Sequence, residues 1–181
     1  MAESLERARI NGVLDTKAAR AEREQAERFE AKRDLFLANF VRTLPPHYRA
    51  YASTAPKRTP GNASALLAAE GLKLTRSLHL YGESGNSKTH VAVWTCARLI
   101  RQHAVGVKFL DEQALDASAY RFDESPDFLS EAAILADDLD KVTPSPRACA
   151  VVNRLLKRPE HELTLFSTAT GTKTSWRGAT A

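Results

Sequence analysis

The chain has few cysteines and no long apolar run, and each shortage argues against a class of protein. Only two of its 181 residues are cysteines, Cys96 and Cys149, and they lie far apart in apolar helical patterns. This spacing offers no disulfide framework and no Cys/His metal cluster, so we expect buried free thiols in a reducing compartment. No apolar run approaches the length of a membrane span, and the N-terminus is too charged for a signal peptide. We therefore expect a cytoplasmic protein with no membrane partner.

The remaining composition is that of an ordinary globular protein. Apolar residues make up 43% of the chain and charged residues 27%, which suits one domain with an extension. A net charge of +4 is compatible with a polyanionic partner but does not require one. The five histidines are scattered without metal-ligand spacing, and no nucleophile lies in an evident triad pattern.

The first 43 residues form the first predicted region. Residues 2–42 contain Gly12 but no proline, and residues 17–33 alternate alanine with charged residues that favour helix, so one or two long helices are expected. The helical face is mostly charged, which suits either a solubilising extension or an arm for a protein or nucleic acid partner. A dense apolar end should dock on the body: Leu35, Phe36, Leu37, Phe40 and Val41.

Two prolines mark the predicted boundary of this arm. Pro45 and Pro46 cannot continue a helix, and a loop rich in proline and hydroxyl residues follows as far as Asn62. We predict a helical arm over residues 1–43, a linker over 44–76 that leads into the core, and a core over 77–181.

Strands and helices alternate through that core. Apolar runs predict strands at 78–81, 107–110, 132–136 and 163–168, and helical patterns lie at 91–100, 111–122 and 147–157. This alternation predicts an α/β fold in which helices cover both faces of a parallel sheet, giving three layers.

The segment from Gly82 to Thr89 follows the first of these strands and precedes a helix. It fits the phosphate-binding pattern G-x-x-x-x-G-K-[ST] except that Ser87 replaces the second fixed glycine. In such a loop backbone N–H groups surround a phosphate, Lys88 supplies a positive charge and the Thr89 hydroxyl can ligate Mg²⁺. A serine forced into a glycine conformation costs roughly 1–3 kcal/mol, which would weaken the site without necessarily abolishing it.

Two carboxylates end the third predicted strand. Asp137 and Asp138 follow an apolar run, and the carboxyl ends of parallel strands share one edge of a sheet. One acid can hold Mg²⁺ and the next can orient or deprotonate an attacking water. An Asp-rich turn is the alternative for this pair, but its position about fifty residues after the loop favours a site.

The order of these elements is similar to that of the AAA+ ATPase core of DnaC-type replicative helicase loaders and the related IstB-like transposition helpers. The similarity spans about residues 44–170. It rests on three stretches: Leu44-Pro45-Pro46-His47-Tyr48-Arg49, the run from Leu80 to Ala92, and Ile134-Leu135-Ala136-Asp137-Asp138-Leu139.

The resemblance implies ATP and Mg²⁺ as cofactors and assigns the site residues. Lys88 would contact the β- and γ-phosphates, Thr89 and Asp137 would hold Mg²⁺, and Asp138 would be the catalytic acid. Ala169 would stand at the position of the usual sensor asparagine, with Thr168 or Thr170 as a substitute. The nucleotide-binding set would be Gly82, Glu83, Ser84, Gly85, Asn86, Ser87, Lys88, Thr89 and His90.

The chain departs from the family at its C-terminal end. Family members continue past the fourth strand with a further helix and strand and a small helical segment that carries an arginine finger. Almost none of that segment is expected here, which would leave the strand at 78–81 at the edge of the sheet. Without the finger, any ATP hydrolysis should be weak.

Three functions are compatible with this pattern. The first is a helicase-loader-like protein in DNA replication, whose implied partners are a replicative helicase, single-stranded DNA and further copies of the chain. The second is a transposition helper that binds duplex DNA. The third is a degenerate P-loop adaptor that does not hydrolyse ATP, a function that Ser87 in the loop would explain.

Overall fold

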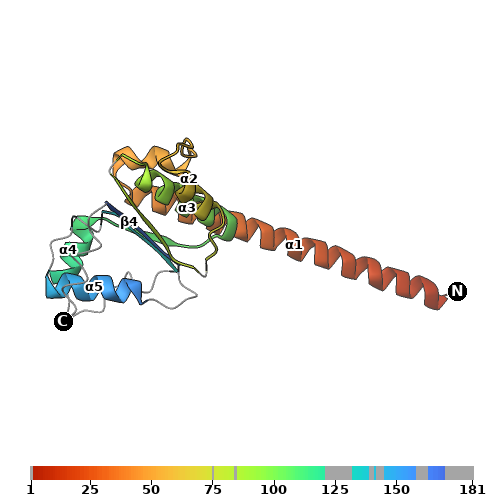
Figure 1. Ribbon diagram of the computed structural model, residues 1–181. Coiled ribbons are helices and arrows are strands. Elements are labelled where there is room, and N and C mark those ends of the chain that lie inside the picture. The colour runs from red at the N-terminus through yellow and green to blue at the C-terminus, as the bar shows by residue number, and fades with distance from the viewer. Residues whose placement is uncertain are drawn as a thin grey trace.

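A parallel sheet of four strands forms the middle layer of the computed structural model (Figure 1). The structure describes residues 2–74, 76–83, 85–120, 132–138, 141, 145–157 and 163–169. Within these ranges it describes the backbone alone for residues 2–15, 116, 118–120, 156 and 163–169.

The sheet has the strand order β1-β4-β3-β2. Its strands are β1 (Leu78–Gly82), β2 (Val107–Leu110), β3 (Ala133–Ala136) and β4 (Leu163–Ala169). Every described pairing is parallel. The predicted parallel sheet is therefore confirmed, and β1 lies at one end of the described order, as the family's strand order led us to expect.

Helices cover both faces of this sheet, which gives the three predicted layers (Figure 1). One face carries α2 (Ala63–Glu70), α3 (Lys88–His103), the short 3₁₀ helix η1 (Pro46–Ala52) and the C-terminal end of α1 (Ala2–Thr43). The other face carries α4 (Glu112–Tyr120) and α5 (Pro146–Leu156).

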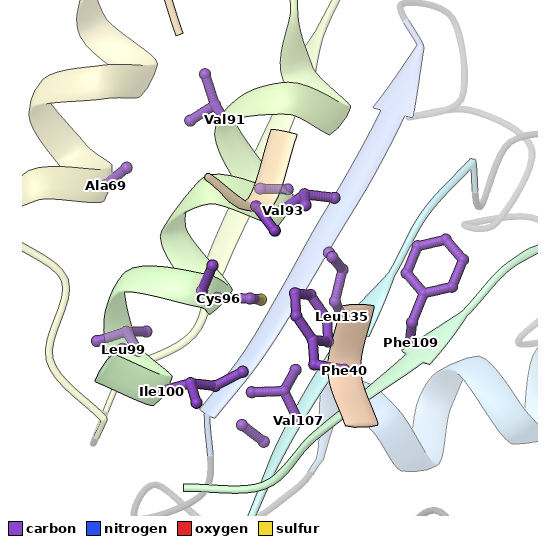
Figure 2. Packing of buried hydrophobic residues seen from close by; sticks show 14 of the residues in the cluster. Phe40, Ala69, Val91, Val93, Cys96, Leu99, Ile100, Val107, Phe109 and Leu135 are labelled. Atoms are coloured by element: carbon purple, nitrogen blue, oxygen red, sulfur yellow. The ribbon is translucent and has the colours of Figure 1, made fainter. Parts of the chain in front are cut away.

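The alternation of side chains along β3 explains why both faces need cover. Ala133 and Leu135 belong to the apolar cluster beneath α1 and α3, whereas Ile134 and Ala136 belong to the cluster beneath α4 and α5. Successive side chains of a strand point to opposite faces, so a strand that is apolar throughout must be buried on both. Figure 2 shows the first cluster, in which Phe40 of α1 lies beside Leu135 among side chains of α3 and the sheet.

Helix α3 forms the centre of that cluster. Val91, Val93, Cys96 and Ile100 are fully buried along it. Thr95 is also fully buried, and its hydroxyl donates to the Val91 carbonyl at 2.6 Å, so no unsatisfied polar group is left there. Burying each large apolar side chain contributes about 1.5–3 kcal/mol, so this helix is firmly anchored against the sheet.

Helix α1 is one helix of 42 residues, about 63 Å long at 1.5 Å per residue. Figure 1 shows it projecting from the body as an arm. Phe40 is buried and Phe36, Leu37 and Val41 are partly buried, as predicted for the docked end. The prediction for Leu35 was wrong, because this side chain is 59% exposed and lies outside the i, i+4 stripe that faces the body.

Local backbone chemistry sets the ends of the helices. Helix α1 ends at Thr43, two residues before Pro45, as predicted, but the prolines then begin η1 where only a helix stop was expected. Ser145 caps α5 by accepting a hydrogen bond from the Ala148 N–H at 3.0 Å. Helix α3 ends at His103, and its C-cap residue Ala104 lies in the left-handed region.

Two expectations about class can be compared with the described residues. Cys96 and Cys149 are free thiols and both are buried, as predicted. Within the described ranges, no helix combines the length and the apolar character needed to cross a membrane.

Candidate nucleotide-binding site

The loop between β1 and α3 has positive φ angles at its two glycines and at Ser87. Gly82 and Gly85 have φ angles of 147° and 88°, which are easy for glycine and strained for other residues. Ser87, which replaces the fixed glycine, has a φ of 57° and lies in the left-handed region. The substitution therefore carries the conformational strain that the sequence led us to expect.

Lys88 is held by the loop that precedes it. Its ammonium group donates to the carbonyl oxygens of Gly82 and Glu83, at 2.9 Å each. An ammonium group has three donors and no acceptor, so these contacts satisfy two of the three. They place the positive charge of Lys88 at the mouth of the loop, beside the first turn of α3.

Thr89 and Asp137 are brought together although 48 residues separate them. The Thr89 hydroxyl donates to Asp137 Oδ1 at 3.1 Å, and the Asp137 side chain is almost fully buried. The Asp137 N–H donates to the Leu110 carbonyl at 2.9 Å, which extends the pairing of β3 with β2 by one residue. A buried carboxylate beside a hydroxyl at the mouth of such a loop fits a Mg²⁺ ion that takes its other ligands from phosphates and water.

Asp138 lies one residue further along, beyond the end of β3. Its φ is 54°, a conformation that aspartate tolerates better than most residues. Its Oδ2 accepts from the Lys141 ammonium at 2.5 Å, and its carbonyl accepts from the Lys141 N–H at 2.9 Å. The predicted catalytic acid is thus paired with a lysine three residues downstream.

Two other predicted site residues, Asn86 and Thr168, lie in or beside the loop. Asn86 lies against the loop before α2, since a Cβ added at Gly61 would come within 2.8 Å of Asn86 Oδ1. Thr168 is paired with Tyr81 on the neighbouring strand, close to where β1 enters the loop. Ser84 and the side chain of Thr168 lie outside the described residues.

His90 points toward η1. Its ring stacks on Tyr51 at a centroid distance of 4.1 Å and an angle of 15°, and its Nε2 lies 2.8 Å from the Thr54 carbonyl. Because a carbonyl oxygen can only accept, Nε2 carries the proton. The side chain of His90 therefore ties η1 to the first turn of α3.

The sequence analysis missed the contribution of Tyr48 to this site. Its ring lines a cleft of about 210 Å³ whose other walls include Phe109, Asp111, Asp137 and Asp138. Burial raises the pKa of the Tyr48 hydroxyl, and the carboxylates of Asp137 and Asp138 raise it further. The signal available in the sequence was the spacing of Tyr48 and Tyr51, since residues three apart line up along a 3₁₀ helix.

The strand order and the site geometry define the fold of this chain. A parallel α/β core, a glycine-containing loop between its first strand and the next helix, and a buried aspartate after β3 form an α/β P-loop fold, here preceded by a long N-terminal helix. No protein-family model and no curated protein matches the sequence.

Solved structures do match this fold. The chain is similar to the DnaC helicase loader at 18% identity and a TM-score of 0.54, over 75% of this chain and 86% of that one. A putative primosome component from Streptococcus pyogenes matches at 19% identity and a TM-score of 0.50, over 70% and 73%. The replication initiator DnaA, bound to AMPPCP and single-stranded DNA, matches at 16% identity and a TM-score of 0.53, over 73% of this chain and 44% of that one.

Proposed function

We propose that the chain binds Mg²⁺ and ATP in the Gly82–Thr89 loop and acts in DNA replication in the manner of a helicase loader. The observation that carries this proposal is the 3.1 Å contact between the Thr89 hydroxyl and the buried carboxylate of Asp137. It brings the two oxygens expected to hold the cation together beside the loop expected to hold the phosphates. The likeness in fold to a helicase loader and a nucleotide-bound replication initiator supports the biological class.

Each residue then has one task in binding. The Lys88 ammonium exchanges the carbonyls of Gly82 and Glu83 for phosphate oxygens, which are stronger acceptors because they carry charge. Backbone N–H groups of the loop and the first turn of α3 surround the phosphates. Thr89 and Asp137 supply ligands to the cation, which when bound neutralises charge on the phosphates.

Hydrolysis requires a further change at Asp138. To orient a water, its carboxylate has to loosen the ion pair with Lys141. We propose that hydrolysis by the chain alone is slow, because the charge of the transition state is normally stabilised by an arginine that a second molecule supplies.

A titration with a fluorescent ATP analogue tests the nucleotide site. We expect binding in Mg²⁺ that weakens by roughly 10-fold or more in Lys88→Ala, because a charge-assisted hydrogen bond contributes about 1.5–3 kcal/mol. Lys108→Ala is the matched control, since Lys108 is exposed on β2 at the other end of the sheet. Equal affinity in all three proteins, or no binding by the folded wild type, would contradict the proposed site.

The arm α1 is the proposed contact for a replicative helicase. Between Thr16 and Asp34 its side chains are almost all exposed and more than half of them are charged. Phe29 is a large apolar side chain among them and is 41% exposed. We expect Phe29→Asp to reduce co-elution with the replicative helicase of the same organism while ATP-analogue binding stays unchanged. Binding of labelled single-stranded DNA by the wild type, measured over a salt series, tests the third implied partner.

A degenerate adaptor that binds no nucleotide is the second candidate. Three observations favour it: the strained φ of Ser87, the internal contacts of Lys88 and the ion pair of Asp138 with Lys141. Ser87→Gly separates the two functions. If the wild type binds no ATP analogue and Ser87→Gly does, the native loop is degenerate, whereas equal binding by both makes Ser87 a tolerated variation.

A further inference from the structure

The side chain of Asn86 lies against two glycines from different parts of the chain. A Cβ added at Gly61 would stand 2.8 Å from Asn86 Oδ1 and 3.2 Å from its Cγ, closer than a carbon atom comes to such atoms in a packed interior. A Cβ added at Gly82, where the Gly82–Thr89 loop begins, would stand 4.0 Å from Asn86 Nδ2. The missing side chain at position 61 therefore makes room for the Asn86 amide against the backbone of the preceding loop.

That preceding loop is a fixed support. Asn62 is 1% exposed, and its Oδ1 accepts from the Thr59 N–H at 2.8 Å while its Nδ2 donates to the Lys57 carbonyl at 3.0 Å. A buried amide whose two ends are both hydrogen-bonded is costly to displace. Gly61 directly precedes Asn62 in the chain, so Gly61 is held at the place where it meets Asn86.

The backbone on either side of Asn86 needs such a support. Gly85 has a φ of 88° and Ser87 a φ of 57°, and a residue with a side chain is strained in that region. Strained conformations persist only where the surrounding structure holds them. The Lys88 ammonium contributes by donating to two carbonyl oxygens at the start of the loop. These are the contacts that Lys88 gives up for phosphate oxygens in the proposed site, so a second restraint has to keep the loop in shape.

We propose that Asn86 is a positioning residue whose side chain is wedged against Gly61 and holds the strained Gly82–Thr89 loop in the shape that receives phosphates. Its effect on binding rests on the proposed nucleotide site, whereas its effect on the loop does not. Asn86 thus shapes the loop by packing against protein, and the phosphates meet other groups of the loop. Gly61 then matters for nucleotide affinity although it lies outside the loop.

Nucleotide titrations of Gly61→Ala test this wedge. Gly61 does not have a positive φ, so alanine adds only a methyl group directed at Asn86. Gly71→Ala is the matched control, because a Cβ there would meet its nearest atom, the Leu67 carbonyl oxygen, at an ordinary 3.8 Å. We expect Gly61→Ala to bind the ATP analogue about fivefold more weakly than the wild type, the equivalent of one side chain forced away from its rotamer. Gly71→Ala should match the wild type.

A double-mutant cycle shows whether the methyl group acts through Asn86. Asn86→Ala removes the wedge and should weaken binding by a similar factor. Because no amide is then left to clash, Gly61→Ala should cause no further loss in the Asn86→Ala background. Losses that multiply in the double variant overturn the wedge, since the two positions then act independently. Wild-type affinity in either single variant overturns it as well.

Hydrogen exchange tests the wedge without nucleotide. The Val91 N–H donates to the Ser87 carbonyl at 2.9 Å, so its exchange rate reports how firmly the end of the loop is held. We expect Val91 to exchange several-fold faster in Gly61→Ala than in Gly71→Ala. The amide of Ala104, which is hydrogen-bonded at the other end of α3, should not change.

The outcomes separate the wedge from the proposed function. Equal exchange of Val91 in the two variants overturns the wedge, whether or not nucleotide binds. If the wild type binds no nucleotide but Val91 responds as expected, the wedge stands and the proposed function fails. If the wild type binds nucleotide and Gly61→Ala changes neither affinity nor exchange, the wedge fails and the nucleotide site stands.

Discussion

Two phenylalanines eleven residues apart on α1 have opposite surroundings. Phe40 is 1% exposed and lies in the main core, whereas Phe29 is 41% exposed on the projecting part of the helix. Both lie on one continuous helix, so helix formation and anchoring have separate causes here. Composition favours helix along the whole segment, but only the stripe that faces α3 and the sheet contributes to the stability of the body.

The strongest test of this contrast is Phe40→Ala. Removing a fully buried phenylalanine loses its transfer free energy and leaves a cavity, so we expect the free energy of unfolding to fall by about 3–5 kcal/mol. Urea unfolding followed by circular dichroism measures this loss. A change below about 1 kcal/mol would show that α1 is not part of the cooperative core.

The buried thiol of Cys96 tests the packing of α3 through the pH dependence of the free energy of unfolding. Complete burial raises the pKa of this thiol above its ordinary range, so the folded protein keeps it protonated while the unfolded chain ionises. The unfolded state then binds fewer protons, and stability should fall as pH rises above the ordinary thiol pKa, by about 2 kcal/mol at pH 10. Unfolding titrations between pH 8 and 10 measure the slope. An identical slope in Cys96→Ala would show that another group causes it.

Ser87→Gly tests the strained loop at the start of the same helix. A left-handed conformation costs a residue with a side chain about 1–2 kcal/mol, and glycine removes this cost. Glycine also loses more backbone entropy on folding than serine does, which offsets part of the stabilisation. We expect a net increase of up to about 1 kcal/mol in the free energy of unfolding. Ser87→Ala keeps the penalty and should show no such increase, so a similar gain in both variants would contradict the conformational explanation.

Phe29→Ala should have the smallest effect and completes the comparison with Phe40. Alanine favours helix slightly more than phenylalanine, and an exposed side chain loses little by truncation. We expect the free energy of unfolding to stay within about 0.5 kcal/mol of the wild type under the conditions used for Phe40→Ala. A loss comparable to that of Phe40→Ala would place Phe29 against the body and contradict the arm.

The sequence analysis located the core elements well because their signals are local. The strand at 107–110 was predicted to the residue, and the strand before the loop and the helix after it lie where the pattern indicated. The edge position of β1 followed from the family resemblance and agrees with the strand order. Leu35 was misplaced because an apolar residue next to a stripe cannot be told from a member of it without the partner surface.

The candidate site was predictable in part. Gly82, Lys88, Thr89 and Asp137 were expected together because a loop after one strand and an acid after another share an edge of a parallel sheet. Tyr48 was not expected there, since it follows a proline pair that indicated only the end of a helix. Its place depends on how η1 packs against α3 and the sheet, which the spacing of Tyr48 and Tyr51 alone does not encode.

The sequence by itself indicated where the core helices lie, the alternation of strands and helices, and the chemical groups of the loop, because propensity, periodicity and turn chemistry act over a few residues. Only the tertiary structure decided which polar side chains meet: Thr89 with Asp137, and Asp138 with Lys141. These contacts depend on distances between elements, and packing of the two cores against the sheet sets those distances.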